Sequence, residues 1–216
     1  MKKIILLIAF LGMFINVFSQ KDPEAENILK TLSKKTKSYS VIQADFTINL
    51  KNIKENIQNT SNGAISMKGN MYFLTFMGSE SYFDGKTLWN YIPEVNEVNI
   101  TEPTPDEDDI FSNPKRLFTI YENDYKYQLV NKITKDGINY SFVDLYPNDL
   151  EEDYSRIRLQ INTENYTISS ATIFGKDGSH YTISLNNYKF DSILPDSYFT
   201  FNDKDYKDIE IIDMRP

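Results

Sequence analysis

The 216-residue sequence has no cysteine, one histidine and only 8 glycines. Without cysteine, the chain has no disulfide, no thiol nucleophile, no soft metal site and no residue for attaching a lipid at a processed N-terminus. His180 falls on the polar side of a predicted strand, without a partner for a catalytic triad and with too few neighbours for a metal site. We also find no glycine-rich loop that would hold a phosphate.

Acidic side chains are common, but they show no arrangement of ligands. The run from Asp106 to Asp109 lacks the alternating spacing and the central glycine of a calcium loop, so we interpret it as a solvated loop. A carboxylate pair for glycoside hydrolysis stays open as an alternative, because spacing in sequence does not give separation in space. We expect no enzymatic activity, no metal and no cofactor.

The N-terminus has the pattern of an export signal. Lys2 and Lys3 precede an apolar run from Ile4 to Ile15, and Ser19 and Gln20 follow it. This run is shorter than the roughly 20 residues that a membrane-spanning helix needs, although a membrane anchor is the alternative interpretation. We predict a cleaved signal peptide over residues 1–20 and one β-rich domain over residues 21–216 in an aqueous exported space.

The chain is acidic, with 23 basic and 31 acidic residues and a formal net charge of -8. Removal of Lys2 and Lys3 with the signal would leave 21 basic residues against 31, a net charge of -10. An acidic surface disfavours nucleic acid and anionic lipid headgroups, so we expect no nucleic-acid partner. Simple solubility explains the same charge.

One helix is expected at the start of the mature chain. Asp22 is a capping residue, Pro23 suits the first helical position, and Glu24 and Glu26 favour the first turn. The apolar stripe consists of Ile28, Leu29 and Leu32. We therefore predict a helix that packs on a sheet, with lysines toward its C-terminal end.

Strands dominate the rest of the sequence. Apolar and polar residues alternate with a period of two over 44–51, 125–129, 156–161 and 180–185. Asp84-Gly85, Asp136-Gly137 and Asp177-Gly178 each lie between two such patterns, which predicts hairpins. We expect about eleven strands in a large antiparallel sheet that curls.

Two segments interrupt the strand pattern. A proline-containing acidic loop runs from Thr101 to Asn113, and Asn113-Pro114 then starts a short helix with Leu117, Phe118 and Tyr121 on one side. The second segment, Leu194 to Phe201, contains Pro195. Both are candidates for pieces that close over the sheet.

The segment from Met71 to Met77 is apolar on both sides of its predicted strand. Such a strand must be covered on both faces. The covers could be the helix, the two irregular segments or a ligand, and the alternative is the middle of a two-layer core.

Several motifs resemble the periplasmic outer-membrane lipoprotein carrier family of LolA type over almost the whole mature chain. The most specific is Phe83-Asp84-Gly85-Lys86-Thr87-Leu88-Trp89-Asn90-Tyr91, which is similar to the family's Asp-Gly-Lys-x-Leu-Trp-x-Tyr hairpin. Residues 39–46, 63–73, 113–118, 145–147, 177–178 and 197–201 follow in the expected order.

The resemblance implies an unclosed half-barrel of mixed α+β class, mainly antiparallel, with a helical lid over a hydrophobic concave face. It also implies a periplasmic carrier that takes lipoprotein acyl chains from an inner-membrane ABC exporter to an outer-membrane acceptor. We expect a monomer. Where family members often carry Arg-Pro, this chain has Lys68-Gly69. That arginine is associated with holding the lid shut, so Lys68 is assigned to the lid together with Leu117, Phe118 and Tyr121, with an exposed turn lysine as the alternative.

Alternation predicts the positions that line the acyl-chain cavity, although any of them could instead pack under the helix. The predicted lining consists of Phe46, Ile48, Leu50, Ile65, Met67, Phe73, Trp89, Ile157, Leu159, Tyr181 and Ile183. Two other functions stay open. One is a lipid- or lipoprotein-sensing interaction module in envelope stress signalling, and the other is a carrier of a glycolipid or triacylglycerol.

Overall fold

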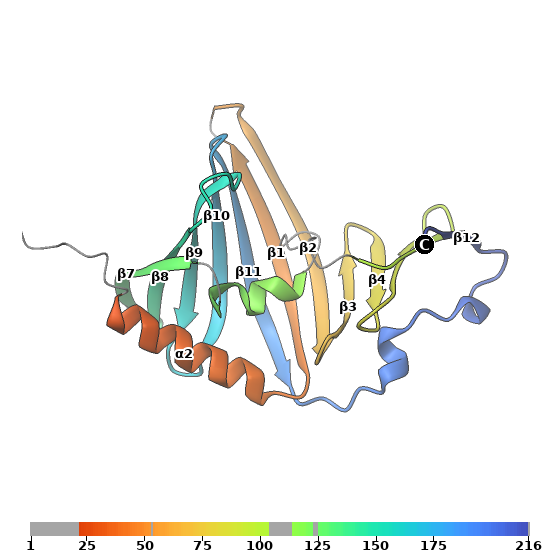
Figure 1. The fold of residues 1–216 in the computed structure, drawn as a ribbon, viewed down its shortest axis with the longest axis horizontal. Helices are drawn as coiled ribbons and strands as arrows, with labels where there is room; N and C mark the ends of the chain where they lie inside the picture. Colours follow the sequence, from red (N-terminus) through yellow and green to blue (C-terminus); the bar gives the residue numbers. More distant parts are fainter. Residues whose placement is uncertain (1–21, 53, 104–113, 123–124, 216) are drawn as a thin grey trace, which may run out of the picture.

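The computed structural model describes residues 22–52, 54–103, 114–122 and 125–215. They form one large sheet with a helix and several short helical turns, so the chain is of mixed α+β class and mainly antiparallel (Figure 1). The predicted signal peptide lies outside these residues. None of the helices in the described part of the chain is both long and apolar enough to cross a membrane.

The sheet contains twelve strands, one more than the sequence pattern indicated. The first six are β1 (Ile42–Asn52), β2 (Ile57–Lys68), β3 (Met71–Phe76), β4 (Ser79–Phe83), β5 (Leu88–Ile92) and β6 (Glu97–Thr101). The others are β7 (Tyr125–Lys135), β8 (Ile138–Pro147), β9 (Tyr154–Asn162), β10 (Thr167–Gly175), β11 (Ser179–Phe190) and β12 (Glu210–Asp213).

The strand order is β12-β6-β5-β4-β3-β2-β1-β11-β10-β9-β8-β7. Because β12 and β7 lie at opposite edges and do not pair with each other, the sheet is unclosed, as predicted. Every pairing is antiparallel except that of β12 with β6. The parallel pair arises because the chain leaves β11 in the middle of the sheet and crosses to the far edge before it forms β12 (Figure 1).

The helix α2 (Pro23–Ser38) confirms the prediction for the start of the mature chain. Asp22 caps it, since its Oδ1 accepts hydrogen bonds from the amides of Glu24 (3.0 Å) and Ala25 (3.2 Å). Its Oδ2 accepts a third from the Leu129 amide of β7 at 2.9 Å. These donors lower the pKa of the Asp22 carboxyl, with the bond from Leu129 as the largest cause. Asp22 thus joins the helix to the edge strand.

Replacing Asp22 with alanine is expected to cost about 1 kcal/mol of the free energy of unfolding, a typical value for a lost N-cap. Because the folded-state pKa is lowered, the stability from this carboxylate is present above the unfolded pKa and is lost as the pH falls through the folded one. Urea unfolding at neutral and at acidic pH measures both effects. A cost that is equally large below the folded pKa would contradict the role of the charge.

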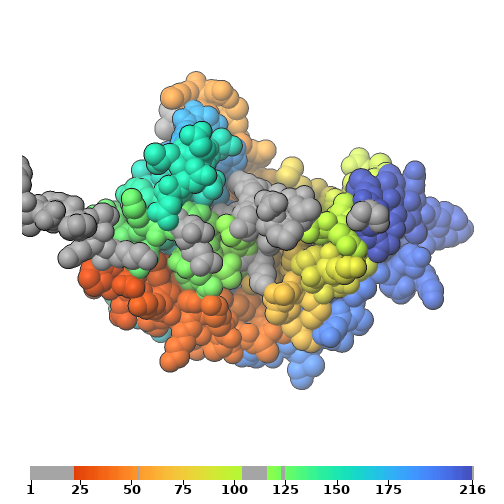
Figure 2. Space-filling view, in the orientation of Figure 1, coloured from red at the N-terminus to blue at the C-terminus, as the bar shows by residue number. Residues whose placement is uncertain are grey.

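Two helical turns follow the segment over 104–113. They are the 3-10 helices η1 (Pro114–Phe118) and η2 (Ile120–Glu122), which confirm a helical start at Pro114 but with tighter turns than an α-helix. The space-filling view shows α2 at the surface, with the chain around residue 120 directly beside it (Figure 2). We call residues 114–122 the 3-10 segment.

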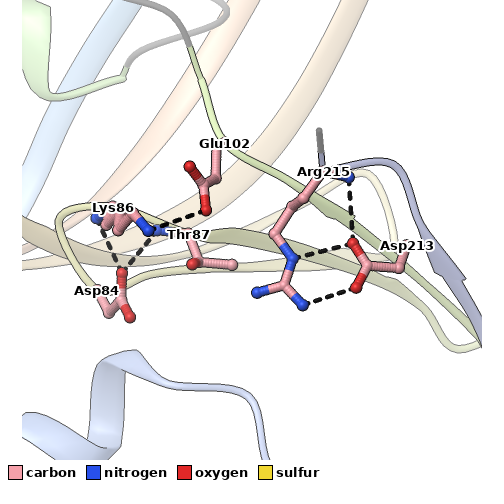
Figure 3. A network of polar contacts seen from close by, with 6 residues as sticks. All are labelled: Asp84, Lys86, Thr87, Glu102, Asp213 and Arg215. Carbon is pink, nitrogen blue, oxygen red and sulfur yellow. Dashed lines mark hydrogen bonds and ion pairs between the residues drawn. The ribbon is translucent and has the colours of Figure 1, made fainter.

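All three predicted hairpins are present, and each of their glycines has a positive φ. In the loop between β4 and β5, Asp84 Oδ1 accepts hydrogen bonds from the amides of Lys86 (2.9 Å) and Thr87 (2.7 Å). The Lys86 ammonium reaches Glu102 at 3.2 Å, and the Asp213–Arg215 pair lies nearby (Figure 3). The Lys86–Glu102 ion pair joins the hairpin to the residue that follows β6.

The two faces of the sheet carry separate cores. The larger core lies on the face that packs against α2, which we call the α2 face. The smaller core lies on the other side, the back face, where Phe201 and Tyr206 of the C-terminal segment stack on each other and pack against Tyr91. The segment 194–201 therefore covers the sheet, as predicted, and does so on the back face. There Phe73 of β3 packs against Tyr198 of η3 (Asp196–Phe199).

Candidate functional site

A band of apolar side chains crosses the α2 face from β5 to β8. Residues directly opposite each other on paired strands point to the same face. Phe46 pairs with Gly63, which pairs with Phe76, and Met67 pairs with Tyr72, which pairs with Phe83. In the other direction the band continues through these pairs: Ile48 with Ile183, Ile183 with Ala171, Ala171 with Leu159, and Leu159 with Val143.

This band has two halves that differ in exposure. Around β8, β9 and β10 the side chains are fully enclosed, and Val143, Leu145, Ile157, Leu159 and Ala171 are each 0% exposed. Around β1, β3, β4, β5 and β11 the band is only partly buried. The half-buried members, which we call the half-open patch, are Ile48, Leu74, Phe76, Phe83, Leu88 and Tyr181.

Gly63 shapes the floor of the half-open patch. A Cβ at this position would lie 2.3 Å from the Phe46 ring and 2.5 Å from the carbonyl oxygen of Thr75. The ring of Phe46 therefore lies directly over Gly63 of β2 and reaches Phe76 on the next strand, with 5.6 Å between ring centroids. Only glycine leaves room for this close approach.

Substituting Gly63 with valine is expected to lower the free energy of unfolding by about 3 kcal/mol, the upper end of the usual overpacking cost, because the ring and the neighbouring backbone must shift. Gly69→Ala is the matched control. An added Cβ there meets nothing within 4 Å, although its φ is +56°. It should cost about 1 kcal/mol through the positive φ alone. Equal losses for the two variants in urea unfolding would contradict the proposed packing.

The α2 face is electrically neutral where tyrosines line it. Burial raises the pKa of the Tyr72 phenol to about 12, and burial also raises the pKa of Tyr188. The Tyr188 hydroxyl donates a hydrogen bond to the carbonyl oxygen of Ile168 at 2.8 Å. These phenols stay protonated at neutral pH, so they add aromatic surface without charge.

The 3-10 segment is fastened to α2 by polar contacts and to the sheet by apolar ones. Glu122 accepts a hydrogen bond from Ser33 Oγ at 2.6 Å and pairs with the Lys37 ammonium at 2.9 Å. The Tyr121 hydroxyl lies 3.4 Å from Thr36 Oγ1, and burial raises the pKa of this phenol. Leu117, Phe118, Ile120 and Tyr121 are buried in the larger core. The segment thus bridges the helix and the apolar band.

Most residues of the predicted lining lie on the α2 face. Phe46, Ile65, Met67, Ile157, Leu159 and Ile183 are buried in the larger core, and Ile48 and Tyr181 pack against it. Leu50 is half-buried near the end of β1, opposite Tyr181. The predicted lid residues Leu117, Phe118 and Tyr121 belong to the same core. Their role in binding a ligand stays a prediction.

Phe73 and Trp89 are placed differently from the predicted lining. Both point to the back face, where Phe73 packs against Tyr82 and Tyr198, and Trp89 joins the smaller core. Alternation alone does not say which of the two apolar faces of a strand packs against α2. Four apolar residues on the α2 face were not part of the predicted lining: Leu74, Phe76, Phe83 and Leu88. The sequence did carry a signal for these residues. They lie in the same hairpins as Phe73 and Trp89, and Leu74 and Leu88 are the direct sequence neighbours of those two residues.

Lys68 contacts the C-terminal segment. Its ammonium donates to the carbonyl oxygen of Leu194 and pairs with Asp196, both at 2.8 Å. Among the described residues, its polar contacts are therefore with the chain that leaves β11 and not with the 3-10 segment. This places Lys68 at the start of the back-face cover, and its part in a lid stays a prediction.

Two pockets formed by described residues lie beside the apolar band. One, of about 500 Å³, lies mostly on the back face between β1, β2, β3 and Tyr198. The other, of about 550 Å³, lies between α2, η2 and β7 and is lined by lysines, glutamates and tyrosines. Within the described residues, no group of three His, Asp or Glu side chains is placed to hold a metal ion.

The comparisons with known proteins identify the family. The family model described as "Outer membrane lipoprotein carrier protein LolA" matches residues 15–179. The chain belongs to this LolA family. The match includes strands β1 to β10 and the 3-10 segment, whereas nearly all of β11 and the whole C-terminal segment follow it. A comparison with curated proteins finds no match.

Solved structures share the fold at low sequence identity. An uncharacterized conserved protein from Thermus thermophilus matches 88% of this chain and 99% of its own, with 12% identity and a TM-score of 0.58. A DUF1329 family protein from Desulfovibrio piger matches 83% of this chain and 97% of its own, with 13% identity and a TM-score of 0.50. A LolA superfamily protein from Nitrosomonas europaea matches 82% and 97%, with 17% identity and a TM-score of 0.45.

Proposed function

We propose that this protein is a periplasmic carrier that binds the acyl chains of lipoproteins on the α2 face and shuttles them from the inner to the outer membrane. Residues 1–20 act as the signal peptide, and residues 21–216 form the carrier domain. An inner-membrane ABC exporter supplies the cargo, and an outer-membrane acceptor receives it. No covalent chemistry is needed.

The observation that supports this function is the half-open patch. A folded domain normally encloses a continuous apolar band completely, yet here six large apolar side chains in one part of the band stay half-buried. A contiguous apolar surface of this kind is a typical binding site for an apolar ligand. In the proposal, the acyl chains lie along β1, β3, β4, β5 and β11 on this face, with the 3-10 segment at their side.

The energetics of an acyl chain explain why such a carrier is required. Each buried methylene gains about 0.8 kcal/mol, so a chain of about sixteen carbons prefers an apolar site over water by roughly 13 kcal/mol. A lipoprotein with several chains cannot cross an aqueous space unshielded. Delivery must therefore be a direct transfer, and a segment that can move away from the patch would permit it.

The test is to isolate the protein from a periplasmic fraction and to identify its bound molecules by native mass spectrometry. We expect an acylated protein or peptide at one copy per chain. In a release assay with spheroplasts, the protein should release a lipoprotein from the inner membrane into solution. Ligand-free protein that releases no lipoprotein would refute the function. A co-purified glycolipid or triacylglycerol would redefine the cargo.

A further inference from the structure

The pocket between α2, η2 and β7 differs in chemistry from the apolar band. Its floor is formed by Leu29 and Tyr121, which are both buried, and its rim carries Lys30, Lys34 and Lys37. These lysines are three and four residues apart, so they lie in a row along one side of the helix. At a rise of 1.5 Å per residue, the row is about 10 Å long.

The row is accessible and only partly neutralised. Lys30 pairs with Glu26 at 2.8 Å and Lys37 with Glu122 at 2.9 Å, and the two lysine side chains are still 74% and 63% exposed. Lys34 is exposed, and within the described residues it forms no ion pair. Three lysines against two glutamates give the pocket a positive balance in a chain whose net charge is -8.

We propose that this lysine row binds the phosphate headgroups of an anionic bilayer and that the headgroups displace Glu122 from Lys37. The inference rests on the proposed carrier function, in which the 3-10 segment lies beside the acyl chains. An extended, exposed row suits a planar array of phosphates better than one small ion. The overall negative charge does not prevent contact, because charges more than a Debye length away, about 8–10 Å, are largely screened.

The consequence of headgroup binding follows from the contacts of Glu122. Ser33 and Lys37 hold one carboxylate oxygen each, and both belong to α2. A phosphate that takes over these donors leaves Glu122 without its ion pair. The attachment of Glu122 to the helix is then lost at the membrane, where cargo is loaded or delivered, and only the longer contact of Tyr121 with Thr36 remains. In the aqueous space between the membranes, both contacts are kept.

The experiment measures partitioning of the whole mature protein, without cargo, onto vesicles of phosphatidylcholine with or without phosphatidylglycerol. Each lysine near an anionic surface contributes about a fivefold gain, so Lys34→Gln/Lys37→Gln should bind the anionic vesicles about 25-fold more weakly. Glu122→Gln should bind them about fivefold more tightly, because it frees Lys37. Hydrogen exchange in residues 117–122 should rise when the wild type meets anionic vesicles.

Matched controls change the same charges elsewhere: Lys204→Gln/Lys207→Gln in the C-terminal segment and Glu94→Gln in the turn after β5. All these side chains are exposed, and neither control should alter partitioning. Control shifts as large as those of the test variants, or equal binding to both vesicles, would overturn the proposal. If inorganic phosphate alone speeds hydrogen exchange in residues 117–122, the site binds a free anion and not a bilayer. The partitioning assay needs no acyl ligand. Its result can therefore be interpreted even if the test of the carrier function fails.

Discussion

Replacing Phe76 with aspartate is expected to weaken binding of an acylated peptide on the order of 100-fold. The substitution removes an aromatic side chain whose full contact with an apolar ligand is worth about 1.5–3 kcal/mol, and it places a charge where the acyl chain must exclude water. Phe76 is half-buried at the centre of the half-open patch, opposite Gly63 and against Phe46. Titration with a fluorescent triacylated peptide measures the loss.

The neighbouring residue supplies the control. Met77 is 71% exposed in the tight turn after β3, and its φ of 51° is one that aspartate tolerates. Met77→Asp makes the same chemical change one position away and should leave the affinity within about twofold of wild type, as expected for a residue outside the contact surface. Equal losses for both variants, or an unchanged affinity for Phe76→Asp with the fold intact, would argue against the half-open patch as the acyl-chain site.

The fold could be predicted largely because its signals are local. The alternation in β1, β9 and β11, the three Asp-Gly hairpins and the cap at Asp22 each depend on residues close together in the sequence. Local patterns do not give the pairing across the sheet. The parallel pairing of β12 with β6 joins residues more than a hundred positions apart, and no period or turn motif indicates it.

The candidate site was harder to predict, for a physical reason. In β3 and β5, both faces carry large apolar residues because the C-terminal segment covers the back face and the band continues on the other. Phe73 and Leu74 are therefore equally apolar in sequence, although they point in opposite directions. Which face is enclosed by the chain itself and which stays half-open depends on where residues 194–209 pack. This packing belongs to the tertiary structure, and the alternation of apolar and polar residues along a strand does not predict it.

A second large effect is expected on the back face, at Asp144. Its side chain is 3% exposed and is held by Arg158, whose Nε and Nη2 lie 2.6 Å and 2.8 Å from the two carboxylate oxygens. Arg156 Nε approaches at 3.3 Å, and its guanidinium lies 3.9 Å from the ring centre of Phe174. Asp144→Ala is expected to cost about 3 kcal/mol of the free energy of unfolding, because it leaves two guanidinium groups without their shared anion.

The Asp213–Arg215 pair is the matched control, since it has the same two-pronged geometry at 2.9 Å and 2.6 Å but lies at the surface. Asp213→Ala should barely move the urea midpoint, because water replaces an exposed partner. Asp144→Leu/Arg158→Leu should recover part of the loss from Asp144→Ala, because it removes one of the two guanidinium groups that Asp144→Ala leaves without their anion and only Arg156 remains unpaired. Acyl-peptide affinity should stay unchanged in the folded Asp144 variant. Phe76→Asp should instead lose acyl-peptide affinity. The two results together would show that the α2 face binds the ligand and that the back face stabilises the fold.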